Sequence, residues 1–146
     1  MVQNMKRAAD LVRRYSAGER GFHGVQLRQA NLNGADLAGA DLSAACLKGA
    51  SLLGADLRGA KLTRADVVGA DFGQADLRGT DLRGTRLGQA NLRLARYDIA
   101  TRFPGGFSPV DGGLVPDESG VVRRTAVRDV LAVLDDDLWK KRGGNG

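Results

Sequence analysis

The chain has 146 residues, of which 42% are hydrophobic and 5% aromatic, with 21 glycines and 3 prolines. These values predict one domain with short appendages, and they exclude a collagen-like chain or a disordered Pro/Ser linker. The net charge is +5, and no basic run is longer than Lys140–Arg142. This modest bias disfavours a specific nucleic-acid site.

Secretion and membrane insertion are not expected. The N-terminus lacks the continuous apolar stretch of a secretory signal, and no segment approaches membrane-spanning length. Cys46 is the single cysteine, so no disulfide can form within the chain. We therefore expect a soluble cytoplasmic protein that does not bind membranes.

The first 19 residues are predicted to form an N-terminal capping helix. Residues 3–16 have the spacing of an amphipathic helix, with Met5, Ala8, Ala9 and Val12 on one stripe and Leu11 and Tyr15 beside it. Such a helix would cover the first coil of the solenoid described next, because terminal coils expose core and unpaired backbone. A basic helix on a membrane surface is the less favoured interpretation, since the apolar stripe is short and lacks Trp or Phe.

Residues 20–99 read as sixteen unbroken repeats of five residues. We call the large apolar residue of each repeat its centre; twelve of the sixteen centres are Leu, and the others are Phe22, Val67, Phe72 and Tyr97. Two residues before the centre stands a small residue, which is Ala in twelve repeats. Two residues after the centre stands Gly in nine repeats, and the residue just before the centre is mostly Asp or Asn.

A period of five fits neither a helix nor a flat strand, because both would spread the leucines over opposite faces. A chain that turns a corner after each repeat directs both apolar positions at a common axis. Four repeats then close a square coil, and the glycines supply the permissive backbone that corners need. The 80 residues make about four coils, with the polar residues outside.

The motif A-(D/N)-L-x-G, as in Ala35–Gly39 and Ala55–Gly59, closely resembles the pentapeptide-repeat family. The resemblance implies an all-β solenoid, a right-handed quadrilateral β-helix. The flanking stretches Leu11–Phe22 and Tyr97–Pro109 are similar to segments that bracket the repeats in cyanobacterial members.

Residues 100–120 are predicted to be a loop rich in Gly and Pro, and residues 121–146 a C-terminal amphipathic helix with its tail. Five apolar residues form its stripe: Val127, Val130, Leu131, Leu134 and Leu138. The helix could fold back onto the solenoid. It could instead pair two chains, since the resemblance implies that gyrase-binding members of the family dimerise through C-terminal elements. Monomer and homodimer both stay open.

The sequence offers little for catalysis, so we expect no enzyme, metal or cofactor. His23 and Cys46 are single residues of their kinds, too few for the usual metal ligand sets or a nucleophile–base pair. The carboxylates recur at intervals of twenty, as in Asp36, Asp56 and Asp76, which predicts stacked columns of similar exposed groups, not an acid–base pair.

The predicted function is a non-enzymatic protein–protein interaction or scaffold module whose partner is another protein. The candidate binding residues are arginines near the last coil and apolar residues of the C-terminal helix: Arg78, Arg83, Arg86, Arg93, Arg96, Leu134, Leu138 and Trp139. A gyrase or topoisomerase modulator that mimics DNA is the alternative implied by the family, and it is disfavoured by the positive charge and short rod. Weak nucleic-acid binding is a second alternative, disfavoured by the lack of exposed aromatic side chains.

Overall fold

The computed structural model describes residues 2–117, with side chains from residue 7 onward. The chain divides into two units, Met1–Pro116 and Asp117–Gly146. The predicted C-terminal helix, with Leu134, Leu138 and Trp139, lies outside the described residues. The fold below is that of the first unit.

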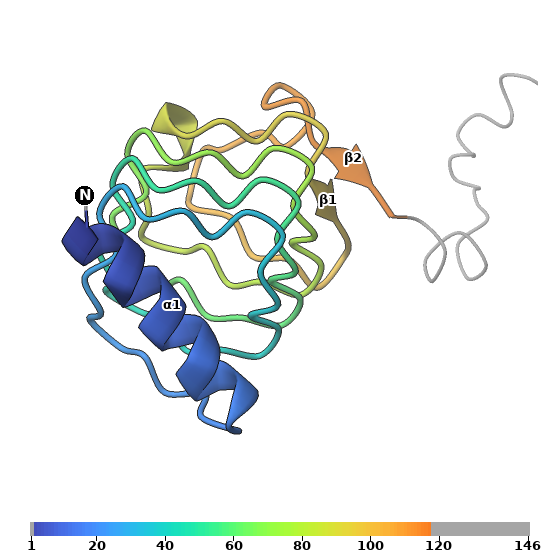
Figure 1. Ribbon diagram of the computed structural model, residues 1–146. Helices are drawn as coiled ribbons and strands as arrows, with labels where there is room; N and C mark the ends of the chain where they lie inside the picture. Colours follow the sequence, from blue (N-terminus) through green and yellow to red (C-terminus); the bar gives the residue numbers. More distant parts are fainter. Residues whose placement is uncertain (1, 118–146) are drawn as a thin grey trace, which may run out of the picture. The chain divides into compact units, whose positions relative to one another are not determined.

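Residues 21–102 wind into a β-helical solenoid in which each coil lies on the one before it (Figure 1). Parallel bridges join residues twenty apart, as in Asn31 to Ser51 and Ser51 to Asp71. At most repeat centres the backbone N–H donates to a carbonyl of the next coil, as from Leu37 to Asp56 at 2.8 Å. The spacing of twenty predicted from the repeats is therefore the spacing of the hydrogen-bonded ladders.

The interior of the solenoid contains the two apolar positions of each repeat. The centres from Phe22 to Leu92 are at most 3% exposed, and the alanines two residues before the centres, from Ala40 to Ala75, are equally buried. Alternation of large Leu and small Ala fills a narrow interior without voids, which is why this pairing of residue sizes recurs. The predicted inward face of the repeats is confirmed.

The corners adopt the left-handed backbone conformation at the position two residues after the centre. All nine glycines there have φ between 68° and 78°. Five residues with side chains are held in the same region, at φ 57° to 63°: Gln29, Ala44, Arg64, Gln74 and Leu94. The geometry of the coil therefore imposes this conformation even where the residue disfavours it.

Helix α1 (Val2–Ser16) lies across one end of the solenoid (Figure 1). Its buried residues are Ala8 and Leu11, and the Tyr15 hydroxyl donates to the Ala38 carbonyl at 2.6 Å. The buried face of this helix predicted from the sequence is wrong in part. Ala9 and Val12 face solvent, Val12 with 39% exposure. The bond from Tyr15 fixes the rotation of the helix and brings Leu11, not Val12, onto the core.

The other end of the solenoid is covered by the segment after Tyr97. The rings of Tyr97, Phe103 and Phe107 pack in sequence, with centroids 5.5 Å and 5.3 Å apart, and Leu114 is buried. Strand β1 (Arg96–Tyr97) pairs in parallel with β2 (Val115–Pro116). Residues 100–120 were predicted to be a loop throughout; the strand at 115–116 corrects this, because the loop returns along the last coil and satisfies its edge.

Candidate interaction surface

The outward residues of the solenoid fall on four sides, which we number by their repeat centres. The sides are side 1 (centres 22, 42, 62 and 82), side 2 (27, 47, 67 and 87), side 3 (32, 52, 72 and 92) and side 4 (37, 57, 77 and 97). On each side the residues just before and just after the centre face outward, and bridges twenty residues apart stack them in columns.

Sides 1 and 4 carry a repeated ion pair that the backbone preorganises. In the tripeptide Asp-Leu-Arg, the Asp carboxylate accepts hydrogen bonds from the backbone N–H and the guanidinium two residues later. The three pairs have Nη2–Oδ2 distances of 2.6–2.7 Å: Asp56–Arg58, Asp76–Arg78 and Asp81–Arg83. Arg58 and Arg96 also approach Asp76 at 3.9 Å.

These pairs lower the pKa of each carboxyl. For Asp56 and Asp81 the largest cause is the hydrogen bond from the arginine side chain. Burial alone would raise the pKa of Asp76, but the hydrogen bonds and charge of Arg78, together with Arg96, lower it overall. Hydrogen bonds to the charged form favour that form, so the three aspartates are ionised near neutral pH.

Side 2 and the corner that leads into it from side 1 have cations of a different kind. Lys48, Arg64 and Arg86 border a hollow of about 370 Å³, which Asp66 and Gln89 also line. Within residues 2–117 none of these three cations forms an ion pair. The excess positive charge of the solenoid is therefore exposed mainly on side 2, while on sides 1 and 4 much of it is neutralised locally.

The comparisons with known proteins agree with this geometry. The family model described as "Pentapeptide repeats (8 copies)" matches residues 22–59 and 55–93. The crystal structure of alr5209 from Nostoc PCC 7120, a pentapeptide repeat protein, is 37% identical over 75% of this chain and 94% of its own, with TM-score 0.40. This chain belongs to the pentapeptide-repeat family.

Other solved pentapeptide repeat proteins are similar to this one. Rfr23 from the cyanobacterium Cyanothece 51142 is 34% identical, with TM-score 0.56; the match covers 57% of this chain and 56% of the length of Rfr23. AT2G44920 from the Arabidopsis thaliana thylakoid lumen is 28% identical over 79% of this chain and 73% of its own, with TM-score 0.38. A search of the curated proteins gives no match. The family and the similarity to Rfr23 together imply that the solenoid is a right-handed β-helix.

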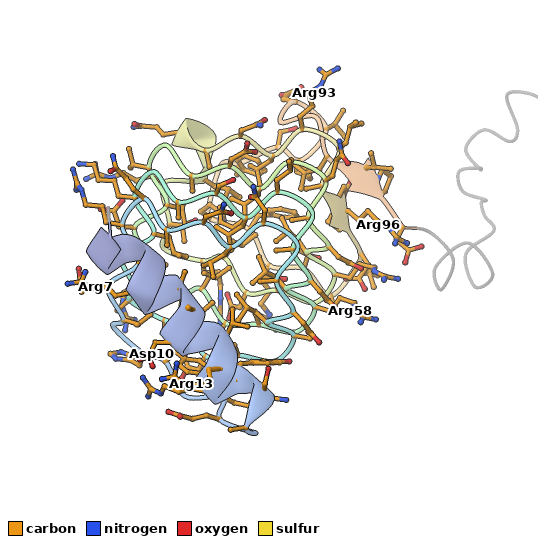
Figure 2. The ribbon with its side chains drawn as sticks, in the orientation of Figure 1. Arg7, Asp10, Arg13, Arg58, Arg93 and Arg96 are labelled. Atoms are coloured by element: carbon orange, nitrogen blue, oxygen red, sulfur yellow. The ribbon has the colours of Figure 1, made fainter. Side chains whose placement is uncertain are left out.

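The five predicted arginines of this pentapeptide-repeat protein lie on four different sides. Arg78 and Arg96 are on side 4, Arg83 on side 1, Arg86 on side 2 and Arg93 on side 3. Figure 2 shows Arg93 well apart from Arg58 and Arg96. Four of them belong to the last coil and Arg78 to the coil before it, so they lie around one end of the solenoid, and no single flat side presents them together.

Sequence reasoning did not select Lys48 and Arg64 as site residues. The sequence did contain a signal for them. An Asp two residues before an Arg predicts a local ion pair, so a cation without such an Asp is expected to lack this pair. Arg58, Arg78 and Arg83 have such an Asp, whereas Lys48, Arg64 and Arg86 do not. Within the described chain, no cluster of three His, Cys, Asp or Glu residues could hold a metal ion. No described helix combines the length and apolar character needed to cross a bilayer.

Proposed function

We propose that this protein is a non-enzymatic module that binds a partner protein with the outer surface of its solenoid. The observation that carries the proposal is the regular ladder of backbone hydrogen bonds, which fixes the outward side chains in columns. A surface of this kind loses little conformational entropy on binding, so modest contacts suffice for affinity.

The proposed site lies around the last coil and uses basic side chains. Arg86 and Arg93 form no ion pair within residues 2–117, so they can meet carboxylates of a partner without first losing a contact. Arg78, Arg83 and Arg96 add positive charge nearby, and Leu134, Leu138 and Trp139 are proposed to supply apolar contacts. A partner with an acidic surface fits this chemistry.

In the same proposal the solenoid has about four coils, α1 closes its first coil, and the C-terminal segment contributes to docking. Burial of Ala8 and Leu11 supports the role of α1. A cytoplasmic location is also part of the proposal, as is a chain that is either a monomer or a homodimer paired through the C-terminal segment.

The test is a nuclease-treated pull-down from lysate of the source organism, comparing the full chain with a chain ended after Gly120. We expect a partner that the full chain retains and the truncated chain loses or holds weakly. Retention of nothing by either chain would contradict the proposal. A partner held equally by both chains would remove the C-terminal segment from the site and leave the solenoid.

Two charge-reversal variants then locate the surface. Arg86→Glu with Arg93→Glu removes cations that have no ion pair in the described chain, whereas Arg78→Glu with Arg83→Glu changes cations already engaged by Asp76 and Asp81. We expect the first variant to weaken binding more than the second at low salt, because only its cations are available to the partner. Equal retention of the partner by both variants and wild type would exclude this surface.

A further inference from the structure

The hydrogen-bonded ladder opens at one place, on side 2 between the last two coils. At every other repeat centre from Phe22 to Leu82, the backbone N–H donates to the next coil, but the N–H of Val67 has no hydrogen-bond acceptor within residues 2–117. The N–H of Arg86, which would donate to the Ala65 carbonyl in the regular pattern, also has none there. The bridge from Asp66 to residue 86 is correspondingly missing among those of the described chain.

Two local features accompany the opening. The hydroxyl of Thr85 donates to the Leu82 carbonyl at 2.7 Å, inside its own turn, and residues Leu87–Gln89 form the 3₁₀ helix η1 in place of a regular corner. The ladder resumes one residue out of step, with the Gly69 N–H donating to Gln89 and not to Gly88.

The opening coincides with the hollow on side 2. Ala65, Asp66 and Val68, which flank Val67, line it from one coil, and Arg86 and Gln89 line it from the next. In the regular coils the N–H groups at these two positions point at the neighbouring coil, so both unbonded donors belong to the interval that has opened. A buried N–H without an acceptor is unfavourable, and an oxyanion is a strong acceptor for it.

We propose that this hollow binds a phosphate group as a dianion. The backbone N–H of Arg86, a residue that lines the hollow, would meet one of its oxygens, whereas Val67 is fully buried beside it. The side chains of Lys48, Arg64 and Arg86 supply three positive charges against the single carboxylate of Asp66, a local balance of +2. Backbone N–H groups released from regular pairing and combined with cations form a typical anion site.

The source of the phosphate group is either a small molecule or a phosphorylated side chain of a peptide. A nucleic-acid strand fits less well, because the outward residues of side 2 include no aromatic side chain for base stacking. The inference does not rest on the proposed protein-binding role, since a free phosphate would occupy the same site.

The test is a titration of the ¹⁵N-labelled full chain with inorganic phosphate and with a short phosphoserine peptide, with its unphosphorylated peptide as control. We expect saturable amide shifts centred on Arg86 and on the other residues that line the hollow. Tighter binding of the phosphopeptide would assign the site to a protein segment, and binding of inorganic phosphate alone would assign it to a small molecule. Absence of shifts with both ligands overturns the proposal.

Charge variants test the cations. Arg64→Gln and Arg86→Gln should each weaken binding about tenfold, the size expected for a lost charge-assisted hydrogen bond. The matched controls are Arg83→Gln, whose side chain is paired with Asp81, and Arg93→Gln, on side 3; both should bind like wild type. An equal loss in all four variants would show attraction by net charge only and would overturn the site.

A backbone variant tests the donors separately. Thr85→Ala with Gln89→Gly restores the small residue and the glycine of a regular repeat while leaving every cation in place. We expect the ladder to close, observed as slowed hydrogen exchange at Val67 and Arg86, and phosphate binding to fall at least as far as in Arg64→Gln. A closed ladder with unchanged affinity would contradict the role of the Arg86 N–H. An open ladder that keeps its affinity, with Arg64→Gln still impaired, would support that role.

Discussion

Side 2 contains two intervals between coils that differ sharply. Between the coils of Cys46 and Asp66 the ladder is closed, with Leu47 donating to Asp66 at 2.8 Å and Asp66 donating to Ala45 at 2.9 Å. Between the coils of Asp66 and Arg86 the equivalent pair is absent from the described hydrogen bonds. Both intervals are built on a buried leucine or valine centre, so core burial alone does not close a ladder.

A comparison of Gln29 with Gln89 narrows down which features distinguish the open interval. Gln29, like Gln89, occupies the corner position on side 2, yet it accepts φ 57° and the bridge from Gln26 to Cys46 is intact. A glutamine at the corner therefore does not open the ladder by itself. Two features are confined to the open interval: Thr85, whose hydroxyl bonds within its own turn, and the 3₁₀ helix η1 in place of a regular corner. An inward threonine is tolerated where its hydroxyl reaches the previous coil, as Thr80 does to Leu57 at 2.7 Å.

The largest effect is expected from shortening a core leucine in each interval. Leu47→Ala should destabilise the protein by about 3 kcal/mol, because a fully buried leucine leaves a cavity between two regular coils. Leu87→Ala should cost less, about 1–2 kcal/mol, because the irregular last coil can relax around the loss. Urea denaturation of both variants measures the difference, and an equal loss would mean that the open interval is as tightly packed as the closed one.

Hydrogen exchange compares the two intervals directly. The amides of Val67 and Arg86 should exchange on the order of a hundredfold faster than those of Leu47 and Asp66, because only the latter are protected by hydrogen bonds between coils. Exchange followed by NMR in native buffer gives the four rates. Equal protection of all four amides would show that the ladder is closed in solution.

Corner residues of side 2 offer a matched pair of substitutions. Gly69 has φ +73°, so Gly69→Ala should cost about 1 kcal/mol of stability, from strain in the left-handed region. Gln89 stands at the same position of the next coil but lies in η1, outside that region, so Gln89→Ala should change stability by less than about 0.5 kcal/mol. Thermal unfolding distinguishes the two; a similar cost at both positions would mean that the last corner is regular.

The smallest effect concerns pH and the paired sides 1 and 4. Because the folded-state pKa values of Asp56, Asp76 and Asp81 are lowered, their stabilisation is present above the ordinary Asp pKa of about 3.9 and is lost as the pH falls through the folded values. Replacing all three by Asn should remove this acid dependence at a cost of under about 1 kcal/mol per exposed pair at pH 7. Urea midpoints from pH 2 to pH 7 test it, and identical acid slopes for variant and wild type would contradict it.

Much of the fold could be predicted from the chain alone because each repeat is a local unit. The centre, the small residue before it and the corner after it are set by side-chain size and backbone preference within five residues. Their burial and positive φ values follow those rules. The rotation of α1 could not be predicted, because Leu11 and Val12 compete for the core and the bond of Tyr15 to Ala38, 23 residues away, decides between them.

The candidate site divides in the same way. The Asp-Leu-Arg pairs are contained in three consecutive residues, so the sequence by itself determined that Arg58, Arg78 and Arg83 are engaged. Only the tertiary structure decided that Lys48, Arg64 and Arg86 border one hollow and that the N–H groups of Val67 and Arg86 are released beside it. Those relations join residues about twenty apart on successive coils, and the irregular turn at residues 85–89 shifts them without changing the repeat that the sequence displays.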